Sequence, residues 1–150
     1  MKKISIIIMI VVHVFLFSCN HSTTKDTVAN KADSTTVLNS TQIQVYYFHL
    51  TNRCATCNSI EANVKSVLET DFASEMQQGV ISFESLNIQE KQNWEIAESY
   101  QTANASLFIT RNTEKGKQTS DLTSQAFMMS LQKPEEFKKI IRDTIQSLLK

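Results

Sequence analysis

Two cysteines placed between a strand pattern and a helix pattern constrain the fold of this chain more than any other feature. Residues 43–50 (IQVYYFHL) are mostly β-branched and aromatic, the composition of a buried strand. Cys54 and Cys57 follow within a few residues. After them, apolar residues recur at the spacing of one helix face: Ile60, Val64, Val67, Leu68 and Phe72. The cysteine pair is therefore predicted to open a helix that follows a strand.

The rest of the chain continues to alternate strand and helix patterns, with Gly79 ending the first helical region. The elements predicted after it are a strand over residues 80–88, a helix over 91–100, strands over 105–110 and 117–122 joined by a turn over 111–116, and a final helical region broken near Pro134. The predicted order is β-α-β-α-β-β-α. Trp94 and the run Phe127-Met128-Met129 are predicted to pack in the core, although methionines beside a dithiol also suit soft metals.

The first 18 residues predict a targeting segment. Lys2 and Lys3 form a basic start, and residues 4–17 are almost all apolar. About 14 apolar residues span about 21 Å as a helix, which is short of the roughly 30 Å thickness of membrane hydrocarbon. Residues 1–18 are therefore predicted to be a cleaved export signal, not a membrane-spanning anchor or part of the core.

The end of this segment, Leu16-Phe17-Ser18-Cys19, resembles the lipobox of bacterial lipoproteins. The resemblance implies transfer of a diacylglyceryl group to the Cys19 sulfur, cleavage before Cys19 and a stable lipid anchor in the membrane. It implies a location in the bacterial cell envelope, facing the periplasm or the exterior. The alternative is an ordinary secretory signal with an incidental cysteine, which would leave Cys19 as a free exposed thiol.

Composition divides the remaining chain into a tether and one domain. Residues 19–41 are rich in Ser, Thr, Asn and Lys and have no apolar periodicity, which predicts a disordered tether. Residues 42–150 are enough for one domain with one core, which is expected to be monomeric. Loss of Lys2 and Lys3 with the signal leaves 13 basic against 15 acidic side chains, a net charge of −2. Because no basic stripe carries interleaved aromatic residues, a nucleic-acid partner is not expected.

A β-α-β-α-β-β-α order with Cys-x-x-Cys between the first strand and the first helix resembles the thioredoxin fold. Residues 85–88 (SLNI) resemble a hydrophobic strand end of thioredoxins, and Tyr100 lies where they commonly carry a tyrosine. Residues 46–61 (YYFHLTNRCATCNSIE) are similar to small thioredoxin-like proteins named after a nitrophenyl-compound nitroreductase subunit. The resemblance implies an α/β three-layer sandwich with a central mixed four-stranded sheet. It also implies that Cys54 and Cys57 form a redox-active disulfide and that no other cofactor is needed.

Several positions depart from the thioredoxin pattern. Ala105 occupies the place of a cis-proline that faces the disulfide in thioredoxins. A cis bond before any other residue costs about 2.5 to 4 kcal/mol, so a trans bond and an altered substrate-docking edge are expected. Arg53 replaces the usual Trp before the first cysteine, and Ala-Thr replaces Gly-Pro between the cysteines. The buried acid that thioredoxins use as a proton relay falls near Phe48, so that role has no evident occupant.

The positions of the two cysteines predict different roles for them. The positive end of the helix dipole stabilises the thiolate of a cysteine at a helix start. Cys54 is predicted to be the nucleophile, and Cys57, one turn on and more buried, to resolve the mixed disulfide. Arg53 and His49 would lower the pKa of Cys54 further if they face its sulfur. The alternatives are a solvated loop charge for Arg53, a satisfied strand-end histidine for His49, and a purely structural disulfide for the pair.

These features predict a membrane-anchored extracytoplasmic thiol-disulfide oxidoreductase that exchanges electrons with the thiols or disulfides of other proteins. A second class stays open. In it, Cys54 and Cys57 chelate a soft metal or metalloid such as copper(I), zinc or arsenite, or the domain serves as an accessory thioredoxin-like subunit. A tetrahedral structural zinc site is not expected, because it needs four ligands and the domain offers two cysteines and His49.

Overall fold

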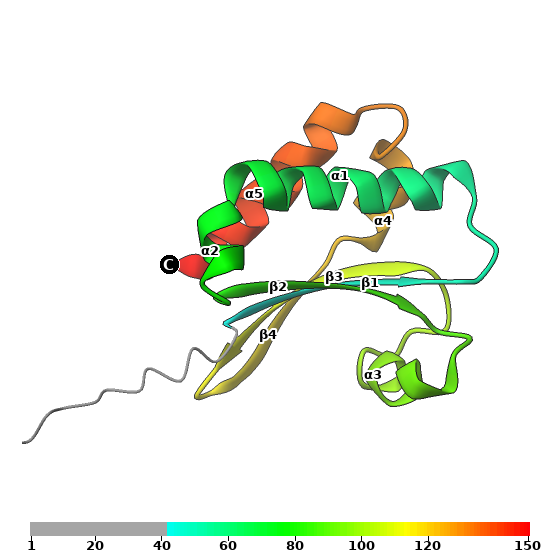
Figure 1. Cartoon of the computed structure of the whole chain (residues 1–150), viewed down its shortest axis with the longest axis horizontal. Coiled ribbons are helices and arrows are strands. Elements are labelled where there is room, and N and C mark those ends of the chain that lie inside the picture. The colour runs from blue at the N-terminus through cyan, green and yellow to red at the C-terminus, as the bar shows by residue number, and fades with distance from the viewer. Residues whose placement is uncertain (1–41) are drawn as a thin grey trace, which may run out of the picture. The chain divides into compact units, whose positions relative to one another are not determined.

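The computed structural model describes residues 42–150, which correspond to the predicted folded domain. The predicted export signal, the predicted lipidation site Cys19 and the predicted tether lie outside the described residues. Four strands form one sheet in the order β2-β1-β3-β4 (Figure 1): β1 (Ile43–His49), β2 (Ile81–Asn87), β3 (Ser106–Thr113) and β4 (Gly116–Asp121). β1 pairs in parallel with β2 and antiparallel with β3, and β4 runs antiparallel to β3. The predicted α/β fold with a mixed four-stranded sheet is confirmed.

Within residues 42–150, five α-helices accompany the sheet: α1 (Ala55–Asp71), α2 (Ala73–Gln77), α3 (Trp94–Ser99), α4 (Thr123–Met129) and α5 (Pro134–Leu149). Helices α1, α4 and α5 lie over one face of the sheet and α3 over the other, which gives three layers (Figure 1). The final helical region is divided before Pro134, as predicted, because proline fits the first position of α5. No helix in this part of the chain is long and apolar enough to cross a bilayer.

Three features of the secondary structure differ from the prediction. The short helix α2 was not predicted. A 3₁₀ turn over Lys91–Asn93 precedes α3, and the Asn93 side chain donates to the carbonyl oxygen of Asn87 at 2.9 Å, so α3 begins late. The β3–β4 turn is shorter than predicted, because the ladder continues until Thr113 pairs with Gly116. Gly116 has a φ of +120°, a conformation that other residues rarely adopt.

The central strand β1 is buried on both faces, because its successive side chains enter two separate apolar clusters. Val45 and Tyr47 belong to the larger cluster, which includes apolar residues of α1 and α5. Tyr46 and Phe48 belong to a smaller cluster on the α3 side. Phe48, near the position of the thioredoxin relay acid, is completely buried among other aromatic rings. The two clusters together fix β1 between the layers.

The prediction that Trp94, Phe127 and Met128 pack in the core is wrong. Their exposed fractions are 54%, 42% and 67%. In α4, Ala126 is buried and Met129, three residues later, packs against the core. Because residues three apart share a helix face, the two residues between them point away from it. Trp94 is the first residue of a helix only six residues long, and its side chain is exposed.

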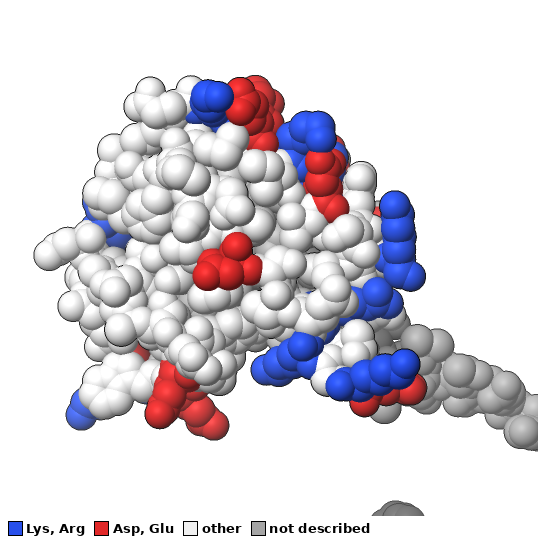
Figure 2. Space-filling view, turned by 180° about the vertical axis from the view of Figure 1, so that it is seen from behind, with Lys and Arg blue, Asp and Glu red and all other residues white. Residues whose placement is uncertain are grey.

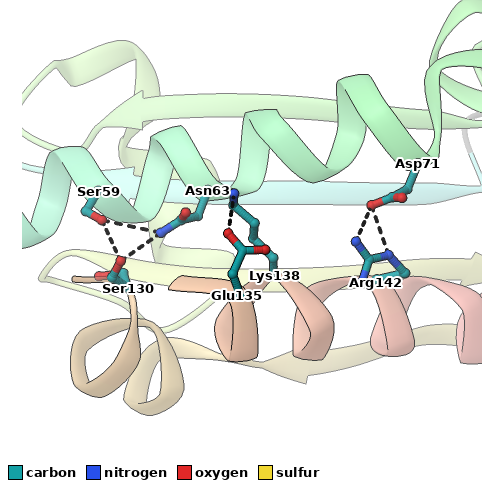
Figure 3. Close-up of polar contacts among 7 residues, drawn as sticks. All are labelled: Ser59, Asn63, Asp71, Ser130, Glu135, Lys138 and Arg142. Atoms are coloured by element: carbon teal, nitrogen blue, oxygen red, sulfur yellow. Dashed lines mark hydrogen bonds and ion pairs between the residues drawn. The ribbon is translucent and has the colours of Figure 1, made fainter. Parts of the chain in front are cut away.

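Polar contacts tie α1 to the C-terminal helices (Figure 3). The carbonyl oxygen of Ser130, just after α4, accepts hydrogen bonds from Ser59 Oγ at 2.7 Å and from Asn63 Nδ2 at 2.9 Å. Near the other end of α1, Arg142 of α5 donates to Asp71 Oδ2 from two nitrogens, at 2.9 and 2.7 Å. Asn63 and Ser130 are buried, so water cannot readily replace their contact.

Replacing Asn63 with Ala should lower the free energy of unfolding by about 0.5 to 1.5 kcal/mol, because the buried carbonyl oxygen of Ser130 loses one of its two donors and keeps Ser59. Chemical denaturation followed by circular dichroism measures the change. Asn58→Ala, at an exposed position of the same helix, is the matched control and should change stability by less than about 0.5 kcal/mol. Equal effects of the two substitutions would show that the Ser130 contact contributes nothing specific.

Candidate redox site

Cys54 caps the amino end of α1 with its own sulfur. Its backbone is extended, with φ −79° and ψ 169°, and its Sγ accepts a hydrogen bond of 3.2 Å from the backbone N–H of Cys57. The sulfur takes the place of the side-chain oxygen that usually caps a helix. Both cysteines are free thiols, and Cys54 is the more exposed of the two, as expected. The pair lies at the start of α1, just after β1, as the sequence predicted.

Local hydrogen bonds favour the thiolate of Cys54. They come from the Cys57 thiol and from the backbone N–H groups of Cys57 and Thr56, and they hold the pKa of Cys54 below its ordinary value against an opposing effect of burial. The positive end of the α1 dipole acts in the same direction. Because the thiolate is the nucleophilic form of cysteine, Cys54 is the sulfur of the pair suited to attack a disulfide.

The Arg53 side chain extends toward the first two turns of α1. Its guanidinium forms an ion pair with Glu61, donates to the carbonyl oxygen of Cys57 at 3.3 Å and lies over the Tyr47 ring, 5.4 Å from the ring centre. Among the described residues, its Nε atom is buried without a hydrogen-bond partner. The solvated-loop alternative for Arg53 therefore does not describe this arrangement. Its predicted effect on the pKa of Cys54 stays a prediction.

Tyr47 reaches the site from β1, although its place in the sequence pattern marks it only as a core residue. Its ring is completely buried, and its hydroxyl donates to the carbonyl oxygen of Cys57 at 3.0 Å. Burial, together with the nearby charge of a Cys57 thiolate, raises the pKa of Tyr47, while hydrogen bonding to Arg53 opposes that rise. The hydroxyl therefore keeps its proton at neutral pH and remains a donor.

Glu61 completes a group of residues in contact at the first turns of α1. We call this group the Arg53 cluster, and its members are Tyr47, Arg53, Cys57 and Glu61. Its carboxylate contacts Arg53 and also Lys65 Nζ, the latter at 2.7 Å. Burial alone would raise the pKa of Glu61, but the hydrogen bonds and charges of Lys65 and Arg53 outweigh it and lower the pKa. The four-residue spacing from Cys57 to Glu61 was the sequence signal that could have suggested a shared helix face.

His49 ends β1, five residues before Cys54. Its Nδ1 lies 3.0 Å from the carbonyl oxygen of Leu50, and its ring centre is 5.9 Å from that of Tyr47. These contacts fit a strand-end histidine satisfied by the backbone. A role for His49 in lowering the pKa of Cys54 stays a prediction.

Ala105 directly precedes β3, and the first residue of β3, Ser106, pairs with Phe48 near the end of β1. Ala105 therefore lies at the same edge of the sheet as the loop that leads to the cysteines. The hydroxyls of Thr102 and Ser106 lie 2.6 Å apart and both are within hydrogen-bonding distance of the carbonyl oxygen of Asn104. No peptide bond within residues 42–150 is cis, in agreement with the trans bond expected before Ala105.

An open groove of about 640 Å³ lies between α3 and the carboxyl ends of β1 and β2. Leu50, at the start of the loop to Cys54, and the exposed Trp94 both line it. A larger hollow of about 1020 Å³ lies at the β3–β4 hairpin, at the opposite end of β1, and is lined by charged and polar residues. Figure 2 shows charged side chains of both signs around a largely uncharged face. Leu50 lines the smaller groove and also begins the loop that leads to Cys54. The smaller groove, and not the larger hollow, therefore adjoins that loop.

The described residues contain no group of three or more His, Cys, Asp or Glu side chains arranged to hold a metal ion. A tetrahedral structural zinc ion, which needs four ligands, therefore has no complete site among the described residues.

Comparisons with known proteins add little. No protein-family model matches the chain, and no curated protein matches it. Among solved structures, the chain is similar to one described as "Structure of a malarial protein", with 13% identity, a TM-score of 0.37, and coverage of 61% of this chain and 96% of that chain. A TM-score this low does not show a shared fold. The class that fold and site define is an α/β domain with a Cys-x-x-Cys pair at a helix start.

In the reduced protein, Cys54 should react with iodoacetamide about tenfold faster than Cys57, because it is more exposed and its pKa is lowered. The rate at Cys54 should reach half its maximum at a pH below 9.0, the ordinary value for the thiol. Pulsed labelling and mass spectrometry of the peptides measure both quantities. Cys57→Ala, which removes the side-chain hydrogen-bond donor, should move that pH upward. Equal labelling of the two cysteines would contradict the assignment.

Proposed function

We propose that this protein is a thioredoxin-like thiol-disulfide oxidoreductase with Cys54 and Cys57 as its redox pair. The observation that carries the proposal is the position of Cys54, an exposed sulfur at the amino end of α1 that accepts hydrogen bonds from Cys57. A disulfide with only a structural role would add little stability across so short a loop. It would also gain nothing from a lowered pKa at the exposed sulfur.

The proposed reaction begins when the Cys54 thiolate attacks one sulfur of a partner disulfide. A bond between Cys54 and the partner forms, the partner's own S–S bond breaks, and its second sulfur leaves as a thiolate. Cys57 then loses its proton and attacks the Cys54 sulfur. The Cys54–Cys57 disulfide forms, and the first partner sulfur leaves as a thiolate. Two electrons have passed to the partner, and the reverse sequence would oxidise a partner dithiol.

The Arg53 cluster supports this exchange by holding the first turn of α1 in place. Tyr47 and Arg53 both donate to the carbonyl oxygen of Cys57. The backbone around the resolving cysteine is thus fixed while Cys54 changes its covalent partner. The groove lined by Leu50 and Trp94 offers an apolar surface next to the Cys54 loop. This surface favours a protein as the partner, because a segment of polypeptide can lie along it.

We also propose, from the sequence alone, that the domain is held in the bacterial cell envelope by lipid on Cys19. Cys19→Ala should prevent incorporation of radiolabelled palmitate and move the protein from the membrane fraction to a soluble one. Detection of the protein by immunoblot after cell fractionation measures the change. Unchanged labelling and retention in the membrane would refute the lipid anchor.

Cys57→Ser should trap covalent complexes between Cys54 and partner proteins in the native host, because no second thiol remains to release them. Non-reducing electrophoresis shows such complexes as bands that disappear when a reductant is added. Cys54→Ser is the matched control, which should trap none and should reduce insulin no faster than the uncatalysed reaction. Trapping by neither variant, or equally by both, would overturn the proposed function.

A further inference from the structure

Glu61 and Arg53 form an ion pair that is largely withdrawn from solvent. The exposed fractions of the two side chains are 13% for Glu61 and 23% for Arg53. Lys65, the second partner of Glu61, is 51% exposed. Because screening by water weakens as exposure falls, the pair with Arg53 is the stronger candidate for a lasting contact. Arg53 is thereby bound at the second turn of α1.

Arg53 is the residue immediately before the nucleophile, so the direction in which its side chain points affects Cys54. A guanidinium beside a thiolate stabilises it and makes the corresponding disulfide more oxidising. In this structure the guanidinium instead contacts Glu61, the Cys57 carbonyl oxygen and the Tyr47 ring. Glu61 is seven residues beyond Cys54, two helical turns along the same face of α1, so it draws the cation along the helix.

We propose that Glu61 is a positioning residue that holds Arg53 along α1, compensates its charge and so keeps the Cys54–Cys57 pair more reducing than it would otherwise be. This inference rests on the proposed function for its biological meaning. The property itself belongs to the dithiol and is measurable without a partner.

The test compares Glu61→Gln with the unchanged protein by equilibration against reduced and oxidised glutathione. With its carboxylate partner removed, Arg53 is free to approach Cys54, and the equilibrium constant for disulfide formation should fall by about threefold to tenfold. Alkylation of Cys54 at pH 7 should also become faster, because a larger fraction of the thiol is ionised. The increase should be smaller than the change in the equilibrium constant, because the thiolate of a more acidic thiol is a weaker nucleophile. Asp143→Asn, which removes an exposed carboxylate paired with Lys139 on α5, is the charge-matched control and should change neither quantity.

Two further variants show whether Glu61 acts through Arg53. Arg53→Gln removes the cation and supplies the background in which Glu61→Gln is measured again. In the double variant, Glu61→Gln should have no further effect, since the two residues are coupled. A full effect of Glu61→Gln in the absence of Arg53 would overturn the proposal.

Stability measurements separate a structural role from the proposed one. If Glu61→Gln lowers the unfolding midpoint but leaves the glutathione equilibrium unchanged, the ion pair is structural only and the inference fails. Failure of the proposed function looks different: Cys57→Ser would trap no partner, whatever the effect of Glu61→Gln on the dithiol.

Discussion

Burial of β1 on both faces holds the other layers of the domain together. β1 pairs with β2 on one side and β3 on the other, and its alternating side chains enter both apolar clusters. Its carboxyl end is therefore fixed in all directions. From there the chain needs only residues 50–53 to reach Cys54 at the start of α1. The position of the cysteine pair is therefore set by packing in the core.

Tyr47 connects this packing to the chemistry, because its ring belongs to the core and its hydroxyl contacts Cys57. Arg53 contacts the same carbonyl oxygen, and Glu61 compensates its charge. The thiolate of Cys54 is favoured by short-range donors from Cys57 and the helix end. The helix start thus favours the thiolate of Cys54. We propose that the Arg53 cluster keeps the Arg53 charge from favouring it further.

The element order and the place of the cysteine pair followed from the sequence, because long apolar periods and the dense strand pattern at 43–50 are local signals. Other features depend on tertiary contacts. Whether Trp94 or Met128 is buried depends on which face a short helix turns to the sheet, and a helix of six or seven residues gives too few repeats to decide. β4 is mostly exposed and polar, so no alternation marked its limits. The pairing of Arg53 with Glu61 depends on side-chain direction, which spacing alone leaves open.

The reduction potential of the Cys54–Cys57 pair in the unchanged protein shows most directly whether the pair exchanges electrons. Equilibration with glutathione, followed by quantification of free thiols, gives the value. A reversible couple between about −270 and −120 mV, the range of working thiol-disulfide oxidoreductases, is expected. A potential below about −300 mV would indicate a structural disulfide, and a pair that remains reduced in excess oxidised glutathione would indicate that the thiols serve another purpose. Either result would contradict a role in thiol-disulfide exchange.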